Sequence, residues 1–103
     1  MPQDELKGFR LTPAAQNDLE TIWDHTVSQW PVAQAETYLQ GLHKTLDLLV
    51  SQPRLGRERG EFTPPVRLHA YRLHMVIYRI EGQYIEVIRI AHNRQNWGVV
   101  LDV

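Results

Sequence analysis

The spacing of the apolar residues changes near residue 53, and this change constrains the fold more than any other feature of the sequence. From residue 15 to residue 49 the apolar residues recur every three or four positions, which is the period of one face of an α-helix. From residue 66 to residue 92 they form runs rich in valine, isoleucine, tyrosine and leucine, in which the helical period is absent. The 103 residues fit one domain. We therefore predict a single α+β domain over residues 1–103.

Two helices are predicted in the first half. Thr12 is a good N-cap and Pro13 suits the first helical position, so one helix begins there. Trp30-Pro31 ends it and opens the next, because the residue before a proline avoids the α conformation. The two apolar stripes are Ala15, Leu19, Ile22, Trp23, Thr26 and Trp30, and then Ala35, Tyr38, Leu39, Leu42, Leu46 and Leu49. Since the break is very short, the helices are expected to be antiparallel neighbours.

The second half is predicted to add strands to one that precedes the helices. The expected strands are residues 9–11, 66–68, 73–80 and 84–92. Residues 53–65 hold two glycines and three prolines with no periodic face, and are interpreted as a connector. Residues 81–83 are interpreted as a hairpin turn, and the runs on both sides are apolar on both faces, as in central strands.

The predicted order is therefore β-α-α-β-β-β, with a helical hairpin packed on one face of a small, curved, mainly antiparallel sheet. Residues 1–7 are expected to be a flexible lead-in and residues 93–103 a C-terminal tail.

Several classes of function are excluded or disfavoured by composition. The chain has no cysteine, which excludes disulfides, thiolate metal sites and thiol catalysis. No apolar run approaches the ~20 residues that span a bilayer, and the acidic, polar start does not resemble a signal peptide. No glycine-rich phosphate loop or zinc-protease motif is present, so no cofactor and no metal are predicted. We expect a cytoplasmic protein without membrane contact.

The charges are distributed unevenly between the two halves. Residues 1–52 carry a net charge of −4 and residues 53–103 carry +3, and all eight cations of the second half are arginines. Arginine offers a planar fork suited to carboxylates and phosphates. Two interpretations are open: a solvated surface that happens to use arginine, or a surface that meets an anionic partner.

A cluster of candidate functional residues lies in the last strand and the tail. Its members are Arg89, His92, Arg94, Asn96 and Trp97. Strand alternation predicts Arg89 on one face and His92 on the other. Arg89 is equally compatible with a structural role, in which its stem is buried and its head pairs with a helix carboxylate.

Arginine beside histidine is also typical of ribonuclease chemistry, which requires a general base as well as a cation. Glu86, Tyr78 and His92 are the nearby candidates, but Glu86 and His92 are ~20 Å apart along a strand. The acid–base set is therefore incomplete, and no catalytic residue is predicted.

The remaining titratable residues are interpreted as structural or solvated. Glu20 and Asp24 are a solvated pair on an exposed helix face, and His25 and His43 are surface or interhelical packing residues. His69 and His74 would lie on opposite faces of a continuous strand, so a metal site there is not expected.

Three segments together carry a family resemblance. They are Leu-Thr-Pro-Ala-Ala…Asp-Leu-Glu…Ile-Trp (11–23), Gln-Pro-Arg-Leu-Gly-Arg (52–57) and Tyr-Arg-Ile…Ile-Glu-Val-Ile-Arg-Ile-Ala-His-Asn-Arg (78–94). In this order the chain resembles ParE-type toxins of the RelE/ParE toxin–antitoxin superfamily. The resemblance implies the fold above, a ParD-type antitoxin that binds the toxin in a hetero-oligomer, and DNA gyrase as the target, with DNA contacted only indirectly.

RelE relatives instead cut mRNA on the ribosome, which is the alternative function. No lysine follows Lys44, and the tail lacks a RelE-like terminal tyrosine or histidine, so the ParE branch is favoured. The usual Leu-His-Gly-Arg of the tail reads Ala-His-Asn-Arg at residues 91–94, and Asn93 tolerates the left-handed conformation that such a bend uses. A toxin that has lost toxicity and is kept for regulation is a third possibility.

The resemblance and the residue types together predict two contact surfaces. Target contacts are assigned to Arg89, His92, Arg94 and Trp97, because arginine and tryptophan dominate interface hot spots. Antitoxin contacts are assigned to Trp23, Trp30, Tyr38, Arg72 and Tyr78, along apolar grooves of the domain.

Overall fold

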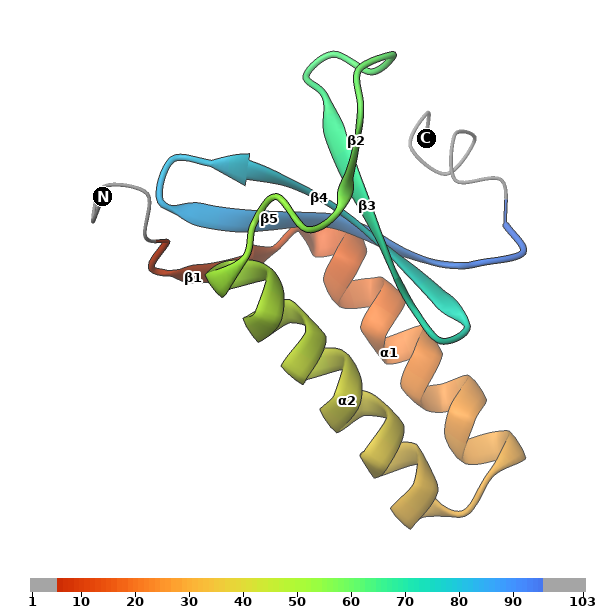
Figure 1. Cartoon of the computed structure of the whole chain (residues 1–103). Coiled ribbons are helices and arrows are strands. Elements are labelled where there is room, and N and C mark those ends of the chain that lie inside the picture. Colours follow the sequence, from red (N-terminus) through yellow and green to blue (C-terminus); the bar gives the residue numbers. More distant parts are fainter. Residues whose placement is uncertain (1–5, 96–103) are drawn as a thin grey trace.

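The computed structural model describes residues 6–95 and shows two antiparallel helices packed on a five-stranded sheet (Figure 1). The elements are β1 (Gly8–Leu11), α1 (Pro13–Gln29), α2 (Val32–Ser51), β2 (Arg57–Arg59), β3 (Val66–Tyr71), β4 (His74–Glu81) and β5 (Tyr84–His92). The strand order is β1-β5-β4-β3-β2, and only the β1–β5 pair is parallel. The predicted α+β fold, with a helical hairpin on a mainly antiparallel sheet, is confirmed.

The connector prediction for residues 53–65 is wrong in one respect, because this segment contains strand β2. Arg57 pairs with Leu68 and Arg59 pairs with Val66, so β2 forms the edge of the sheet beside β3. A short, charged edge strand is held mainly by backbone hydrogen bonds and buries little apolar surface. It therefore leaves no alternation of apolar residues in the sequence.

The start of α1 is fixed by Thr12, as predicted. The backbone N–H of Ala15 donates to Thr12 Oγ1 at 3.1 Å, which caps the helix. The Thr12 hydroxyl in turn donates to the carbonyl of Ile88 at 2.7 Å. One side chain therefore caps α1 and attaches it to β5.

The core has two parts, one on each face of the sheet. The helix-facing part comprises Ala15, Ile22, Leu42, Leu46, Leu49, Val76, Tyr78, Ile85, Val87 and Ile90. The opposite face carries a smaller cluster of Val66, Ile77 and Ala91, against which Phe62 packs. Strands β4 and β5 contribute to both, which confirms the prediction that they are central.

Tyr78 is a core residue, and its assignment as an antitoxin contact is wrong. Its side chain is 0% exposed, and its hydroxyl accepts from Gly56 N–H at 2.9 Å and donates to the Pro53 carbonyl at 2.8 Å. A Cβ at position 56 would lie 2.5 Å from that hydroxyl, which explains the glycine. Tyr78 thus holds the connector to the sheet and offers no surface to a partner.

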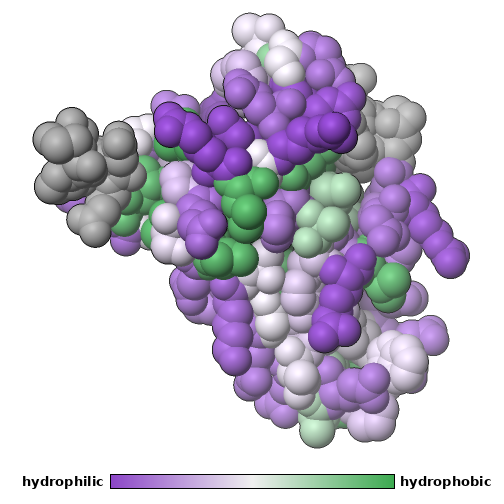
Figure 2. All heavy atoms as spheres, viewed as in Figure 1, coloured by the Kyte–Doolittle hydropathy of each residue, from purple (hydrophilic) through white to green (hydrophobic). Residues whose placement is uncertain are grey.

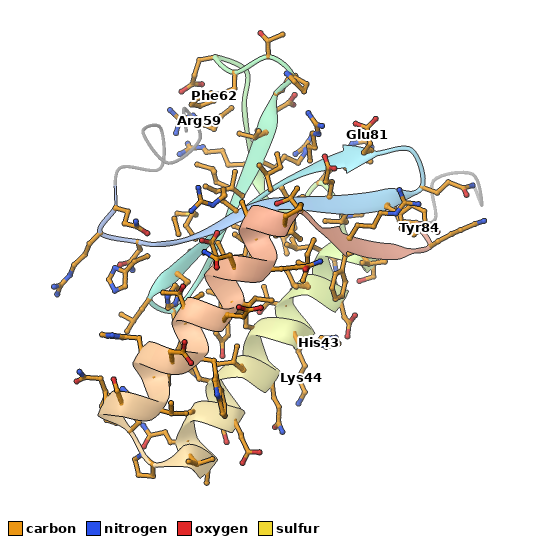
Figure 3. The ribbon with its side chains drawn as sticks, turned by 180° about the vertical axis from the view of Figure 1, so that it is seen from behind. His43, Lys44, Arg59, Phe62, Glu81 and Tyr84 are labelled. Carbon is orange, nitrogen blue, oxygen red and sulfur yellow. The ribbon has the colours of Figure 1, made fainter. Side chains whose placement is uncertain are left out.

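Four of the eight arginines of the second half, all within residues 6–95, form ion pairs with carboxylates. Arg59 pairs with Glu61, Arg67 with Glu58 and Arg79 with Glu86. Figure 2 shows hydrophilic residues gathered over the β2–β3 hairpin, and Figure 3 shows Arg59 and Phe62 at its far end. The ion pairs favour a solvated surface over a surface that binds an anionic partner in this part of the molecule.

Candidate functional site

The end of β5 lies beside the turn between β3 and β4. The Asn93 N–H donates to the Leu73 carbonyl at 2.8 Å, and the Asn93 side-chain amide donates to the Arg72 carbonyl at 3.2 Å. Among the non-glycine residues of the range 6–95, Arg72 alone has a positive φ, of 50°. Asn93 therefore does not adopt the left-handed conformation in the bend at residues 92–95. Gln95 N–H closes that bend on the His92 carbonyl at 2.9 Å.

Arg89 is held by Asp18 of helix α1. Asp18 accepts from Arg89 Nε at 2.8 Å, from Arg89 Nη2 at 2.9 Å and from the backbone N–H of Ile90 at 2.8 Å. The two side chains are 12% and 25% exposed, for Asp18 and Arg89 respectively. The bond to Asp18 raises the pKa of the Arg89 guanidinium above its ordinary value. Arg89 therefore joins β5 to α1, as in the structural alternative for this residue.

The prediction that Arg89 and His92 lie on opposite faces agrees with the strand pairing. The β4–β5 pairing shifts by one residue between Ile77 and Tyr78, so Ile88 is an additional residue on β5. This β-bulge precedes Arg89, and beyond it Arg89 pairs with Ile77 and His92 pairs with His74 in unbroken alternation. Both residues nevertheless line one cavity, because the Arg89 side chain is directed to Asp18 of α1.

We call this cavity the histidine cavity. It has a volume of about 410 Å³ and lies between α1, the start of α2 and the paired ends of β4 and β5. Its lining includes Asp18, Ile22, His25, Trp30, Tyr38, Leu73, His74, Arg89, Ile90, His92 and Gln95. It therefore combines apolar walls with a group of titratable side chains, as small-molecule sites do.

Two histidines meet in this cavity, and the sequence analysis did not pair them. His74 stands opposite His92 on neighbouring strands, with ring centroids 5.4 Å apart and planes at 74°. His74 Nδ1 is 2.7 Å from the Tyr38 hydroxyl. Burial, reinforced by His92 and His25, lowers the pKa of His74 to about 4, against a weaker opposing effect of Asp18. The His74 imidazole is therefore neutral near pH 7.

The other predicted site residues fall into three groups. Arg94 is exposed at the end of β5, whereas Trp97 and Asn96 lie outside the described residues. Trp30 is 54% exposed and, with Tyr38 and Arg72, lines a second hollow of about 460 Å³ beside the histidine cavity.

The residues of the third group line neither the histidine cavity nor the second hollow. Trp23 is half-buried on α1 and lines neither of these hollows. Glu20 and Asp24 are exposed, and Glu86 is engaged by Arg79. Among residues 6–95 no group of three or more His, Asp or Glu side chains is arranged to hold a metal ion, and no helix there is long and apolar enough to cross a membrane.

Comparison with known proteins first defines the fold. A solved structure described as "Chromosomal ParDE TA system from P. aeruginosa" matches with a TM-score of 0.72 and 23% sequence identity, over 86% of this chain and 97% of that one. The α+β arrangement of Figure 1 is thus shared with a protein of a toxin–antitoxin system.

Sequence comparison then defines the family. The model described as "ParE toxin of type II toxin-antitoxin system, parDE" matches residues 9–97. Toxin ParE1 of Mycobacterium tuberculosis is 40% identical over 89 residues, which are 85% of this chain and 91% of that toxin. Toxin ParE1 of Caulobacter vibrioides is 32% identical over 91 residues, 88% and 94% of the two chains. The chain belongs to the ParE toxin family of type II toxin–antitoxin systems.

We predict that Asp18→Asn lowers the free energy of unfolding by about 2–3 kcal/mol, because it weakens three hydrogen bonds and leaves a partly buried guanidinium without its counter-charge. Urea denaturation followed by circular dichroism measures the change. Asp24→Asn on the exposed face of the same helix is the matched control and should change stability by less than about 0.5 kcal/mol. Equal effects of the two substitutions would contradict the structural role of Asp18.

A second prediction concerns pH. Because the pKa of His74 is about 4 in the folded chain and 6.5 ordinarily, the unfolded chain binds more protons between these values. The stability contributed by neutral His74 is therefore complete above pH 6.5 and is lost as the pH falls toward 4, by about 2 kcal/mol after allowance for solvent near the ring.

The measurement is the pH dependence of unfolding free energy in the wild type and in His74→Gln. The difference between them should change across pH 6.5 to 4. A His74 ring that titrates near 6.5 by NMR would contradict the prediction.

Proposed function

We propose that this ParE-family toxin arrests growth by binding DNA gyrase in the cytoplasm without catalysing a reaction, and that a ParD-type antitoxin neutralises it in a hetero-oligomer. The observation that carries the proposal is the family match, which extends from β1 through the end of β5 to residue 97. The target and the antitoxin type follow from what the ParE resemblance implies, and DNA would be contacted only through those partners.

The geometry of the arginines supports binding over catalysis. Arg89, the arginine within the last strand, is directed to Asp18 and so is engaged in the fold. Arg94 stands exposed just beyond the strand, where a protein partner can reach it. We therefore assign target contact to Arg94, together with His92 and Trp97, and keep Arg89 as a residue that positions the strand end.

The exposed apolar residues support an antitoxin surface on the second hollow. Trp30 is 54% exposed and Leu73 is 56% exposed, and both line the hollow that Tyr38 and Arg72 also border. Large apolar side chains exposed together are typical of interaction sites. We propose that the antitoxin covers Trp30, Tyr38 and Arg72, with Trp23 as a further contact.

One observation favours the alternative function. His74 and His92 form a pair, the backbone N–H of Arg94 donates to His92, and a histidine pair is a conventional acid–base set for RNA cleavage. A RelE-like ribosome-dependent endoribonuclease would use these residues. Mapping of mRNA ends in growth-arrested cells discriminates, because the gyrase proposal expects intact mRNA.

We predict that the purified toxin inhibits DNA supercoiling by gyrase and accumulates cleaved DNA. Arg94→Ala should raise the toxin concentration for half-inhibition at least about tenfold, as expected for an arginine hot spot. Arg57→Ala, an exposed arginine on β2, is the matched control and should leave inhibition unchanged.

Co-expression with the antitoxin encoded beside the toxin should restore growth. Full gyrase activity at high toxin excess, with a folded toxin confirmed by circular dichroism, would contradict the proposed target.

A further inference from the structure

The histidine cavity offers hydrogen-bond donors in a defined chemical form. The Leu73 N–H donates to the Tyr38 hydroxyl oxygen at 3.3 Å, so the hydroxyl hydrogen is available for His74 Nδ1 at 2.7 Å. We assign His74 Nδ1 as the acceptor of this hydrogen bond, which places the proton of the neutral ring on Nε2. The pKa of His74, lowered to about 4 mainly by burial, agrees with a neutral ring.

His92 has the same tautomer for a different reason. The backbone N–H of Arg94, which can only donate, points to His92 Nδ1 at 3.1 Å. Neutral His92 consequently carries its proton on Nε2 as well. Two imidazole Nε2–H donors thus stand on facing strands, with ring centroids 5.4 Å apart.

Neither of these donors is used by the described part of the chain. No hydrogen bond joins either Nε2 to another residue of the described chain, and within that part of the chain no buried side-chain nitrogen or oxygen lacks a partner. An Nε2 atom without a partner must therefore be accessible to solvent, and both rings line the cavity.

We propose that the histidine cavity binds a small organic carboxylate. Its oxygens accept hydrogen bonds from the Nε2–H groups of His74 and His92, and its apolar part packs against Ile22, Trp30 and Leu73. This proposal does not rest on the proposed gyrase target, although His92 belongs to both surfaces.

A carboxylate fits better than other groups for two reasons. The open ring positions are donors only, so the complementary group must be an acceptor, and an ionised carboxylate only accepts. Asp18, the carboxylate of the lining, is already occupied by Arg89 and the Ile90 N–H, so it repels the ligand less. Since Arg89 is engaged by Asp18, the cavity suits a monoanion with an apolar body more than a phosphate dianion.

The test uses 3-phenylpropionate as the probe and 3-phenylpropanamide as its uncharged match, each added to the whole chain at pH 7.5. Long-range ¹H–¹⁵N NMR of the histidine rings reports the tautomers and the binding. We expect Nε2–H tautomers for His74 and His92, saturable shifts of both rings at about millimolar acid, as suits a ligand of this size, and at least about tenfold weaker binding of the amide.

Two substitutions at one position isolate the donor. His92→Gln and His92→Leu both lose the Nδ1 acceptor, but only the glutamine keeps an N–H near the position of Nε2. His92→Leu should weaken binding at least about tenfold and His92→Gln at most about threefold.

Either of two results would overturn the proposal: equal affinity for acid and amide in the wild type, or an Nδ1–H tautomer for His74. Both are measured on the unmodified chain, so a variant that fails to fold leaves the test intact. Shifts confined to His25, His43 or His69 would likewise contradict it.

Discussion

The hydrogen bonds that the Asp18 carboxylate accepts from Arg89 and Ile90 hold the end of strand β5 in place, and the site described above depends on them. Strand β1 pairs with β5 only as far as Val87, and beyond that point β5 would present an open edge. There the backbone N–H of Thr12 donates to the Val87 carbonyl, and the Thr12 hydroxyl donates to the Ile88 carbonyl. The Asp18 carboxylate accepts hydrogen bonds from the Ile90 N–H and from Arg89. Residues 12–18 thus complete the pairing of β5 and fix helix α1 against it.

This arrangement separates the arginines into different roles. Arg89 is used to hold α1 on β5, and Arg59, Arg67 and Arg79 are neutralised by nearby glutamates. The partner surface that we propose lies at the far end of the sheet, around Arg72, Leu73, His92 and Arg94. The contacts of Asp18 hold this end of β5 on helix α1, which would give such a surface a rigid support.

The sequence predicted the helices and central strands because those elements carry strong periodic patterns. It missed β2, whose three charged residues are held by backbone pairing with β3, which leaves no pattern. It also misjudged Tyr78, because an aromatic side chain in a strand gives no sign of whether it is buried.

The histidine pair was missed for a specific geometric reason. The two-residue turn at Gly82-Gln83, extended with regular pairing, would place His92 opposite Leu73 and leave His74 beside Ala91. The bulge near Ile88 moves the register by one residue and brings the two rings together. Bulges of this kind have little sequence signature, so a one-residue shift at the site is seen only in the structure.

In the function that we propose, growth arrest depends on direct contact between gyrase and the end of β5. Photo-cross-linking detects such a contact: Arg94, or Arg57 as control, is replaced with a photo-reactive phenylalanine, and the toxin is illuminated with gyrase. We expect a cross-link to a gyrase subunit from position 94 and little from position 57. No cross-link from position 94 while gyrase is fully inhibited, or equal yields from both positions, would contradict it.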